Sequence, residues 1–359
     1  MESDGGEARL GAPQRVPAHA LFFPLAAAYA AAALPASIAA MLGLVPPIPG
    51  LASPAGHAHE MLFGFALAAV AGNQLGPTLR WRLLLLLGAW LAGRAAFLAA
   101  PGSAVALAAN AAFALILAAF LAPRLLIAAK KLRNRALPVT LVALCIAAIA
   151  RDLVVGVLLL ALLMLFMGGR IVAPAAAGQL YRQGGQLAAR VQPRIEGALI
   201  VLMLFAAACA ATGWTRAAGV AAIASGALAG VRLARWRLWA LAARRDLLCL
   251  GAGYAWLALG LLGMGLAMAR GTPATTVLHA ITVGAIGTLT INVMALTWAR
   301  LARRDPSREA LPVAATVLVA AATAARLLAE GRASWLLFAA LCWSGAYVLL
   351  LALFAKLRR

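Results

Sequence analysis

Residues 57–77 read HAHEMLFGFALAAVAGNQLGP, a cluster of polar side chains followed by a long apolar run. Two histidines, a glutamate and a methionine open the stretch, and no charged residue follows Glu60 before Arg80. About 20 mainly apolar residues are enough to cross a bilayer as a helix. The stretch therefore predicts a membrane-spanning helix whose first turns carry groups that can bind a ligand.

The composition of the whole chain supports the same architecture. Of its 359 residues, 65% are hydrophobic and only 11% are charged, whereas a soluble domain is about half apolar and about a quarter charged. Apolar runs recur from Leu21 to the C-terminus. Cutting the sequence at charged residues, prolines and glycines gives these predicted spans: 20–44, 57–77, 83–100, 102–122, 136–150, 153–172, 195–213, 215–231, 247–269, 274–298, 310–329 and 333–355. We predict an all-α, polytopic membrane bundle of about twelve transmembrane helices.

The connections between the predicted spans leave no room for a further domain. We expect residues 1–18 to form a short cytoplasmic tail, because they lack the basic and apolar segments of a signal peptide. Residues 19–359 are then a single membrane domain. The glycine pair in GGR at 168–170 predicts the end of the span 153–172.

The distribution of basic residues predicts the orientation of the chain. The formal net charge is +21, which in a soluble protein would indicate a nucleic-acid partner. Here most of the 31 Lys and Arg residues fall in alternate loops, among them 124–135, 232–245 and 300–308. Basic loops favour the cytoplasmic side of a membrane. Both termini are therefore expected to be cytoplasmic, and no nucleic-acid partner is expected.

Three of the four histidines are predicted to lie in one layer near the external face. His57 and His59 begin one span, and His279 lies about five residues into the span 274–298, while His19 begins the first span from the opposite side. Ionisable groups inside a membrane are costly and point to function, and imidazole is the commonest metal ligand. We expect His59 and His279 to clamp a haem iron or to share a copper ion.

Other side chains near these histidines have several possible roles. His57 and His59 are two residues apart, about 200° on a helix, so either His57 lies in the loop before the helix or the two serve different centres. Met61 would suit copper(I), and Glu60 would orient an imidazole. Arg94 is predicted to reach the external interface or to bind an anionic group such as a haem propionate. The alternatives are histidines bonded to loop carbonyls and a methionine that only packs.

Three of these motifs together resemble one known family. HAHEMLFGFALAAVAG at 57–72, GGR at 168–170 and LHAITVGAIGTLTINVM at 278–294 resemble the NnrS family, and the resemblance extends across the chain. It implies a multi-pass protein of the bacterial inner membrane that contains haem, expected to be of the b type, and copper. It also implies a role in the response to nitric oxide and nitrosative stress. By this resemblance His57, His59 and His279 are metal-site positions, and Glu60 belongs to the same motif.

The resulting functional hypothesis is a haem-binding, and also copper-binding, membrane protein that handles or senses nitric oxide. Its expected partners are the lipid bilayer and nitric oxide as a small-molecule ligand. The sequence indicates no protein partner, and it does not predict whether the protein catalyses a reaction. One alternative is a transporter or exporter of a metal or small solute that uses the external histidines. Another is a carrier that holds haem transiently.

Overall fold

The computed structural model describes residues 15–358, and these residues form a bundle of long helices. Eleven helical segments of this described part are long and apolar enough to cross a membrane. Most are single α-helices: α1 (His19–Met41), α4 (Arg80–Ala99), α5 (Ala104–Ala128), α6 (Leu132–Ala150), α7 (Leu153–Arg182), α8 (Pro193–Ala211), α9 (Thr215–Arg235), α10 (Arg245–Arg270), α12 (Ala310–Leu328) and α13 (Ala333–Leu357).

Two of the predicted spans contain a π-helical segment. The span predicted for 57–77 consists of α2 (Pro54–His59), the π-helical η1 (Glu60–Ala66) and α3 (Leu67–Gln74), which follow one another without a break. The span predicted for 274–298 consists of the π-helical η3 (Ala280–Ala285) and α11 (Ile286–Leu301). With the composite helix included, the prediction of an all-α bundle of about twelve transmembrane helices is confirmed. The chain is a multi-pass membrane protein whose surroundings are a lipid bilayer.

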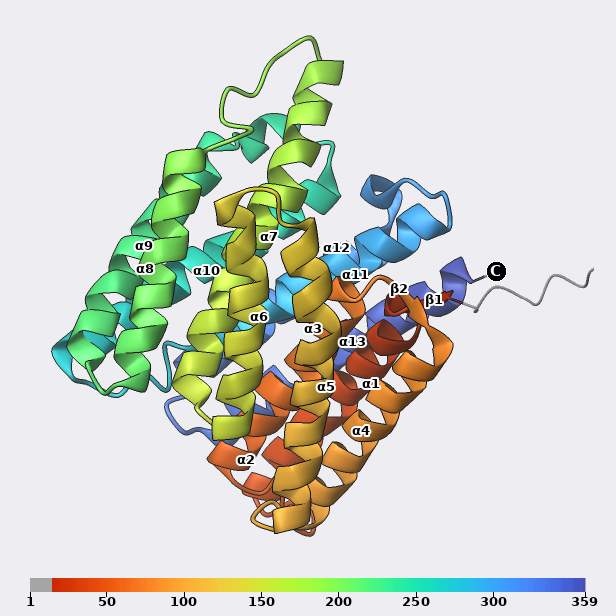
Figure 1. Cartoon of the computed structure of the whole chain (residues 1–359), viewed down its shortest axis with the longest axis vertical. Helices are drawn as coiled ribbons and strands as arrows, with labels where there is room; N and C mark the ends of the chain where they lie inside the picture. The colour runs from red at the N-terminus through yellow and green to blue at the C-terminus, as the bar shows by residue number, and fades with distance from the viewer. Residues whose placement is uncertain (1–14, 359) are drawn as a thin grey trace, which may run out of the picture.

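The two ends of the described chain lie at the same end of the bundle (Figure 1). The strand β1 (Arg15–Pro17) pairs antiparallel with β2 (Pro77–Leu79). The His19 ring, at the start of α1, lies 6.3 Å from the Trp298 ring near the end of α11, and Arg358 lies 5.9 Å from the same indole. We call this the terminal end of the bundle, and the opposite end, where α1 finishes, the distal end. Residues 1–14, most of the predicted tail, lie outside the described residues.

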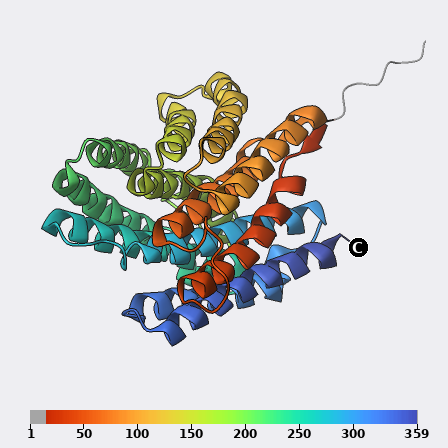
Figure 2. The same ribbon diagram turned by 90° about the horizontal axis from the view of Figure 1, so that it is seen from below.

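The first and last helices of the bundle pack side by side. Trp343 of α13 donates a hydrogen bond to the carbonyl of Ala30 at 3.0 Å, and Ser344 donates to the carbonyl of Ala31 at 2.6 Å. Figure 2 shows α13, in dark blue, running along the red α1. This contact places α12 and α13 close to α2, so side chains far apart in the sequence can meet at the distal end.

The prediction that GGR ends a helix is wrong, because α7 continues from Leu153 to Arg182. The two glycines make room for side chains from neighbouring helices instead. A methyl group on Gly168 would clash with the Tyr254 ring, and one on Gly169 would clash with the Arg232 guanidinium. Arg232 is 3% exposed, so the glycine pair permits a charged side chain to be buried against α7.

A pair of glycines also lets α9 and α10 approach closely. A Cβ on Gly219 would lie 2.5 Å from the Ala269 nitrogen and 2.6 Å from the Gly265 oxygen. Because both atoms belong to backbone, Gly219→Ala is expected to lower the free energy of unfolding by about 1–3 kcal/mol. Gly230→Ala, on the same helix with nothing within 4 Å, should raise it by about 0.5–1 kcal/mol. Thermal unfolding in detergent measures both, and equal effects would contradict the close packing.

Candidate functional site

Two histidines from distant parts of the sequence line one cavity at the distal end. His57 comes from α2 and His279 from the residue that precedes η3, and the cavity between them, of about 30 Å³, is also lined by Met61 and Trp343. An adjoining cavity of about 30 Å³ is lined by the same two histidines and by Arg326 of α12. The structure thus brings together three of the four residues predicted as metal ligands.

The predicted start of the span that carries His279 is wrong. The predicted span began at residue 274, but residues 275–278 form turns and His279 is the N-cap of η3. His57, in contrast, lies inside α2, which begins because Ser53 accepts a hydrogen bond from the Gly56 nitrogen and Pro54 takes the first helical position. Both imidazoles nevertheless reach the same cavity.

Hydrogen bonds fix the tautomer of His57. Ser37 of α1 is fully buried, and its hydroxyl donates to the carbonyl of Leu51 at 2.7 Å. The hydroxyl has one proton, so toward His57 Nδ1, 3.1 Å away, the Ser37 oxygen acts as an acceptor. Nδ1 of His57 therefore carries the proton, and Nε2 of the neutral ring carries the lone pair.

The same argument applies to His279. Its Nδ1 lies 2.6 Å from the carbonyl oxygen of Thr275. A carbonyl oxygen only accepts, so Nδ1 is protonated and Nε2 again carries the lone pair. Within residues 15–358, no hydrogen bond engages Nε2 of His57 or of His279. Both rings thus present an unoccupied lone pair, which is the arrangement of metal-binding histidines held by a second partner.

His59 lies on a different face of the helix from His57. Its Nδ1 is 3.2 Å from an oxygen of Glu60, and its ring stacks on Phe97 with the ring centres 4.0 Å apart. It is not among the residues that line the cavity of His57 and His279. The partner of His279 at this cavity is therefore His57, not His59 as we expected from depth. His59 Nε2 is buried without a hydrogen-bond partner in the described residues.

Glu60 is the centre of a buried polar network. It is fully buried, and Arg94, 4% exposed, donates to it at 2.7 Å. Tyr29 also donates to Glu60, and Arg94 donates to the Asn110 side chain. Gly64 makes this possible, because a methyl group there would clash with the Arg94 guanidinium. Arg94 therefore faces the interior rather than the interface, and the geometry does not support its predicted role in binding a propionate.

Sequence reasoning missed three members of these arrangements. Ser37, Tyr29 and Asn110 all belong to predicted spans, and each is an isolated polar residue in an apolar run. That isolation was a usable signal, because a polar group in a membrane helix requires an internal partner. Which partner each residue finds depends on the packing of helices and could not be read from the sequence.

The available donors suit one copper ion better than a haem. Within the described part of the chain, no group of three or more His, Cys, Asp or Glu residues could hold a metal, so a metal at the cavity relies on His57, His279 and the thioether of Met61. Imidazole and thioether ligands favour copper(I). Pockets for larger ligands have volumes of about 300–1,000 Å³, so a haem does not fit these cavities with the side chains as they stand.

The two helices that carry these histidines both contain π-helical geometry: η1 begins three residues after His57, and η3 begins directly after His279. π turns are rare in proteins, and those that occur are frequently found at functional sites. No curated protein matches this chain. The family model described as NnrS protein matches residues 16–358, nearly the whole chain. The chain therefore belongs to the NnrS family.

Proposed function

We propose that this chain is a copper-binding protein of the bacterial inner membrane that handles nitric oxide. One observation carries the proposal. His57 and His279, from helices far apart in the sequence, line one cavity with their Nδ1 atoms engaged and their Nε2 lone pairs free. Two such imidazoles with Met61 beside them are a donor set for copper(I).

The charge near the cavity also favours copper(I). Arg326 lines the second of the two cavities, which is also lined by His57 and His279. Its positive charge repels a divalent ion about twice as strongly as a monovalent one at the same distance. In addition, no carboxylate of residues 15–358 lines either cavity to offset the charge of a divalent ion.

Nitric oxide suits this location for reasons of size and polarity. It is a small uncharged molecule that partitions into membranes, and the walls of the cavity are largely apolar, with Leu34, Phe65 and Trp343 among them. Copper, when held by His57 and His279, would supply the atom that binds nitric oxide. The chain supplies two fixed imidazoles and an apolar surrounding that excludes water.

Metal analysis of the purified protein tests the proposal. The protein is expressed with ample copper and haem, purified in detergent, and analysed for both metals, with absorption spectra before and after reduction. We expect about one copper per chain, no Soret band, and uptake of nitric oxide by the copper-loaded protein but not by the copper-free protein.

Two outcomes would overturn the proposal. A protein with neither copper nor haem would exclude it and leave the alternative of a transporter. A Soret band that His57→Ala and His279→Ala both remove would show that these histidines hold a haem, and that the helix ends separate to admit it.

A further inference from the structure

A separate cavity of the bundle lies away from the histidines. It has a volume of about 100 Å³ and lies between α3, α7, α10 and α11. Most of its wall is apolar, including Leu160, Leu163 and Met164 of α7 and Leu289 of α11. None of the described residues that line it carries a charge. Its contents must therefore be mainly apolar and uncharged.

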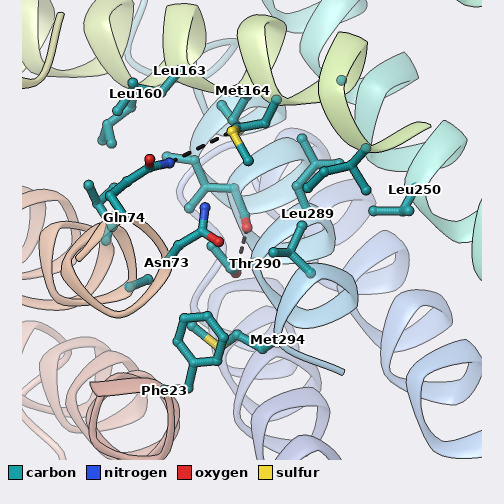
Figure 3. Close-up of a pocket in the computed structure, with 18 of the residues that line it drawn as sticks. Phe23, Asn73, Gln74, Leu160, Leu163, Met164, Leu250, Leu289, Thr290 and Met294 are labelled. Atoms are coloured by element: carbon teal, nitrogen blue, oxygen red, sulfur yellow. Dashed lines mark hydrogen bonds between the residues drawn. The ribbon is translucent and has the colours of Figure 1, made fainter. Parts of the chain in front are cut away.

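Two side-chain amides face this apolar space. Figure 3 shows Asn73 and Gln74 extending from α3 toward the side chains of α7 and α11. Among the described residues, the Gln74 side chain donates only to the sulfur of Met167, at 3.7 Å, and a thioether is a weak acceptor. No hydrogen bond joins the Asn73 side chain to any residue within 15–358, although other amides such as Asn110 and Asn292 are bonded.

Unsatisfied amides are costly in apolar surroundings. Asn73 and Gln74 are partly exposed, and an amide that faces apolar side chains without a hydrogen bond costs about 1–3 kcal/mol by mutational data. The arrangement of Asn73 and Gln74 therefore predicts a ligand that brings its own hydrogen-bonding groups to this side of the cavity.

We propose that this cavity binds the ring edge of a lipophilic quinone and of its quinol. At about 100 Å³ the cavity does not enclose the whole molecule, so the rest of it lies between α3 and α7. A quinone ring offers carbonyl oxygens, which accept from the amide NH₂ groups, and a quinol offers hydroxyl groups, which donate to the amide oxygens. An amide carries both functions, so the same two residues satisfy both redox forms. A phosphate headgroup or a fatty-acid carboxylate would instead require a Lys or Arg, and no Lys or Arg of the described part of the chain lines the cavity.

Access and location agree with such a ligand. Val70 and Asn73 on α3 and Met164 and Met167 on α7 are partly exposed, so a membrane-soluble molecule can enter between these two helices. Ile286 lines both this cavity and the cavity of His57 and His279, so the ring would bind next to the proposed metal site. Binding itself does not depend on the presence of copper.

Binding of decylubiquinone to the metal-free protein in lipid nanodiscs tests the inference. Affinity is measured by titration calorimetry for wild type, Asn73→Leu and Met164→Trp, with Leu115→Trp as the control, because Leu115 is 59% exposed on the lipid-facing surface. We expect Asn73→Leu to weaken binding about tenfold through the lost hydrogen bond. Met164→Trp should abolish binding by filling the cavity, and Leu115→Trp should leave it unchanged.

A second probe separates a quinone site from a general apolar site. Decylbenzene has the same tail but no oxygen atoms, so wild type should bind it at least about tenfold more weakly than decylubiquinone. Equal affinity for the two probes, or equal binding of decylubiquinone by wild type and Asn73→Leu, would show that an acyl chain occupies the cavity instead. No binding of decylubiquinone by wild type would also overturn the inference.

Discussion

Arg94→Leu is expected to lower the free energy of unfolding by about 3–5 kcal/mol. The substitution leaves the fully buried Glu60 without its guanidinium partner, which donates at 2.7 Å. Breaking a buried ion pair from one side costs this much because an uncompensated charge remains in apolar surroundings. Thermal unfolding in detergent measures the loss. Arg216→Leu, at an exposed position at the start of α9, is the control and should change the stability by less than about 0.5 kcal/mol.

The double substitution Glu60→Gln/Arg94→Leu separates the effect of the unpaired charge on Glu60 from the effect of losing the packing of Arg94. Once the carboxylate is replaced by a neutral amide, no buried charge is left uncompensated, and Tyr29 can still donate to the amide oxygen. The double variant should therefore be more stable than Arg94→Leu alone, as replaced buried ion pairs commonly are. If the double variant were less stable than Arg94→Leu, the buried charge of Glu60 would not be the cause of the lost stability.

His57→Ala and His279→Ala are each expected to weaken copper(I) binding by at least about 100-fold. Loss of a residue that only supports a ligand already weakens metal binding by about 10–100-fold, and these two residues are the ligands themselves in the proposed site. Competition with a copper(I) chelator of known affinity measures the change. His19→Ala, at the terminal end of the bundle, is the control and should bind copper as wild type does.

His59→Ala decides between the two pairings of histidines. If His59 and His279 bound the ion together, as their depth in the sequence predicts, His59→Ala would bind copper as weakly as His279→Ala does. The cavity seen in the structure, which His59 does not line, predicts copper binding close to wild type. Ser37→Ala should lie between these limits, with affinity reduced by about 10–100-fold, because Ser37 orients the His57 ring.

The transmembrane spans were predictable because hydropathy is a property of a local window. The span predicted for 333–355 is α13 (Ala333–Leu357), and the one predicted for 310–329 is α12 (Ala310–Leu328). A helix in lipid satisfies its own backbone hydrogen bonds, so no knowledge of neighbouring helices is needed to locate it. Two boundaries were wrong: residues 275–278, at the start of the span predicted for 274–298, form turns, and α7 continues past its predicted end to Arg182.

The pairing of the site residues was not predictable in the same way. Depth placed three histidines near one end of the bundle, but the choice between His57 and His59 depends on which face of α2 meets the helices of the C-terminal half. The prediction that GGR at 168–170 ends a helix was wrong for a related reason. A glycine pair is equally typical of a helix end and of a close contact, and only the position of Arg232 shows that this pair serves contact.

The π-helical segments η1 and η3 shift the phase of the two helices that carry the histidines. A π turn holds more residues than an α turn, so the inward-facing stripe before it does not continue in register after it. A helical wheel drawn for residues 54–74 as one α-helix would therefore assign the wrong residues to lipid. Each of these helices therefore has two parts that face their neighbours independently. The orientation of the distal turns is set by the histidine site, and that of the remaining turns is set by packing against the neighbouring spans.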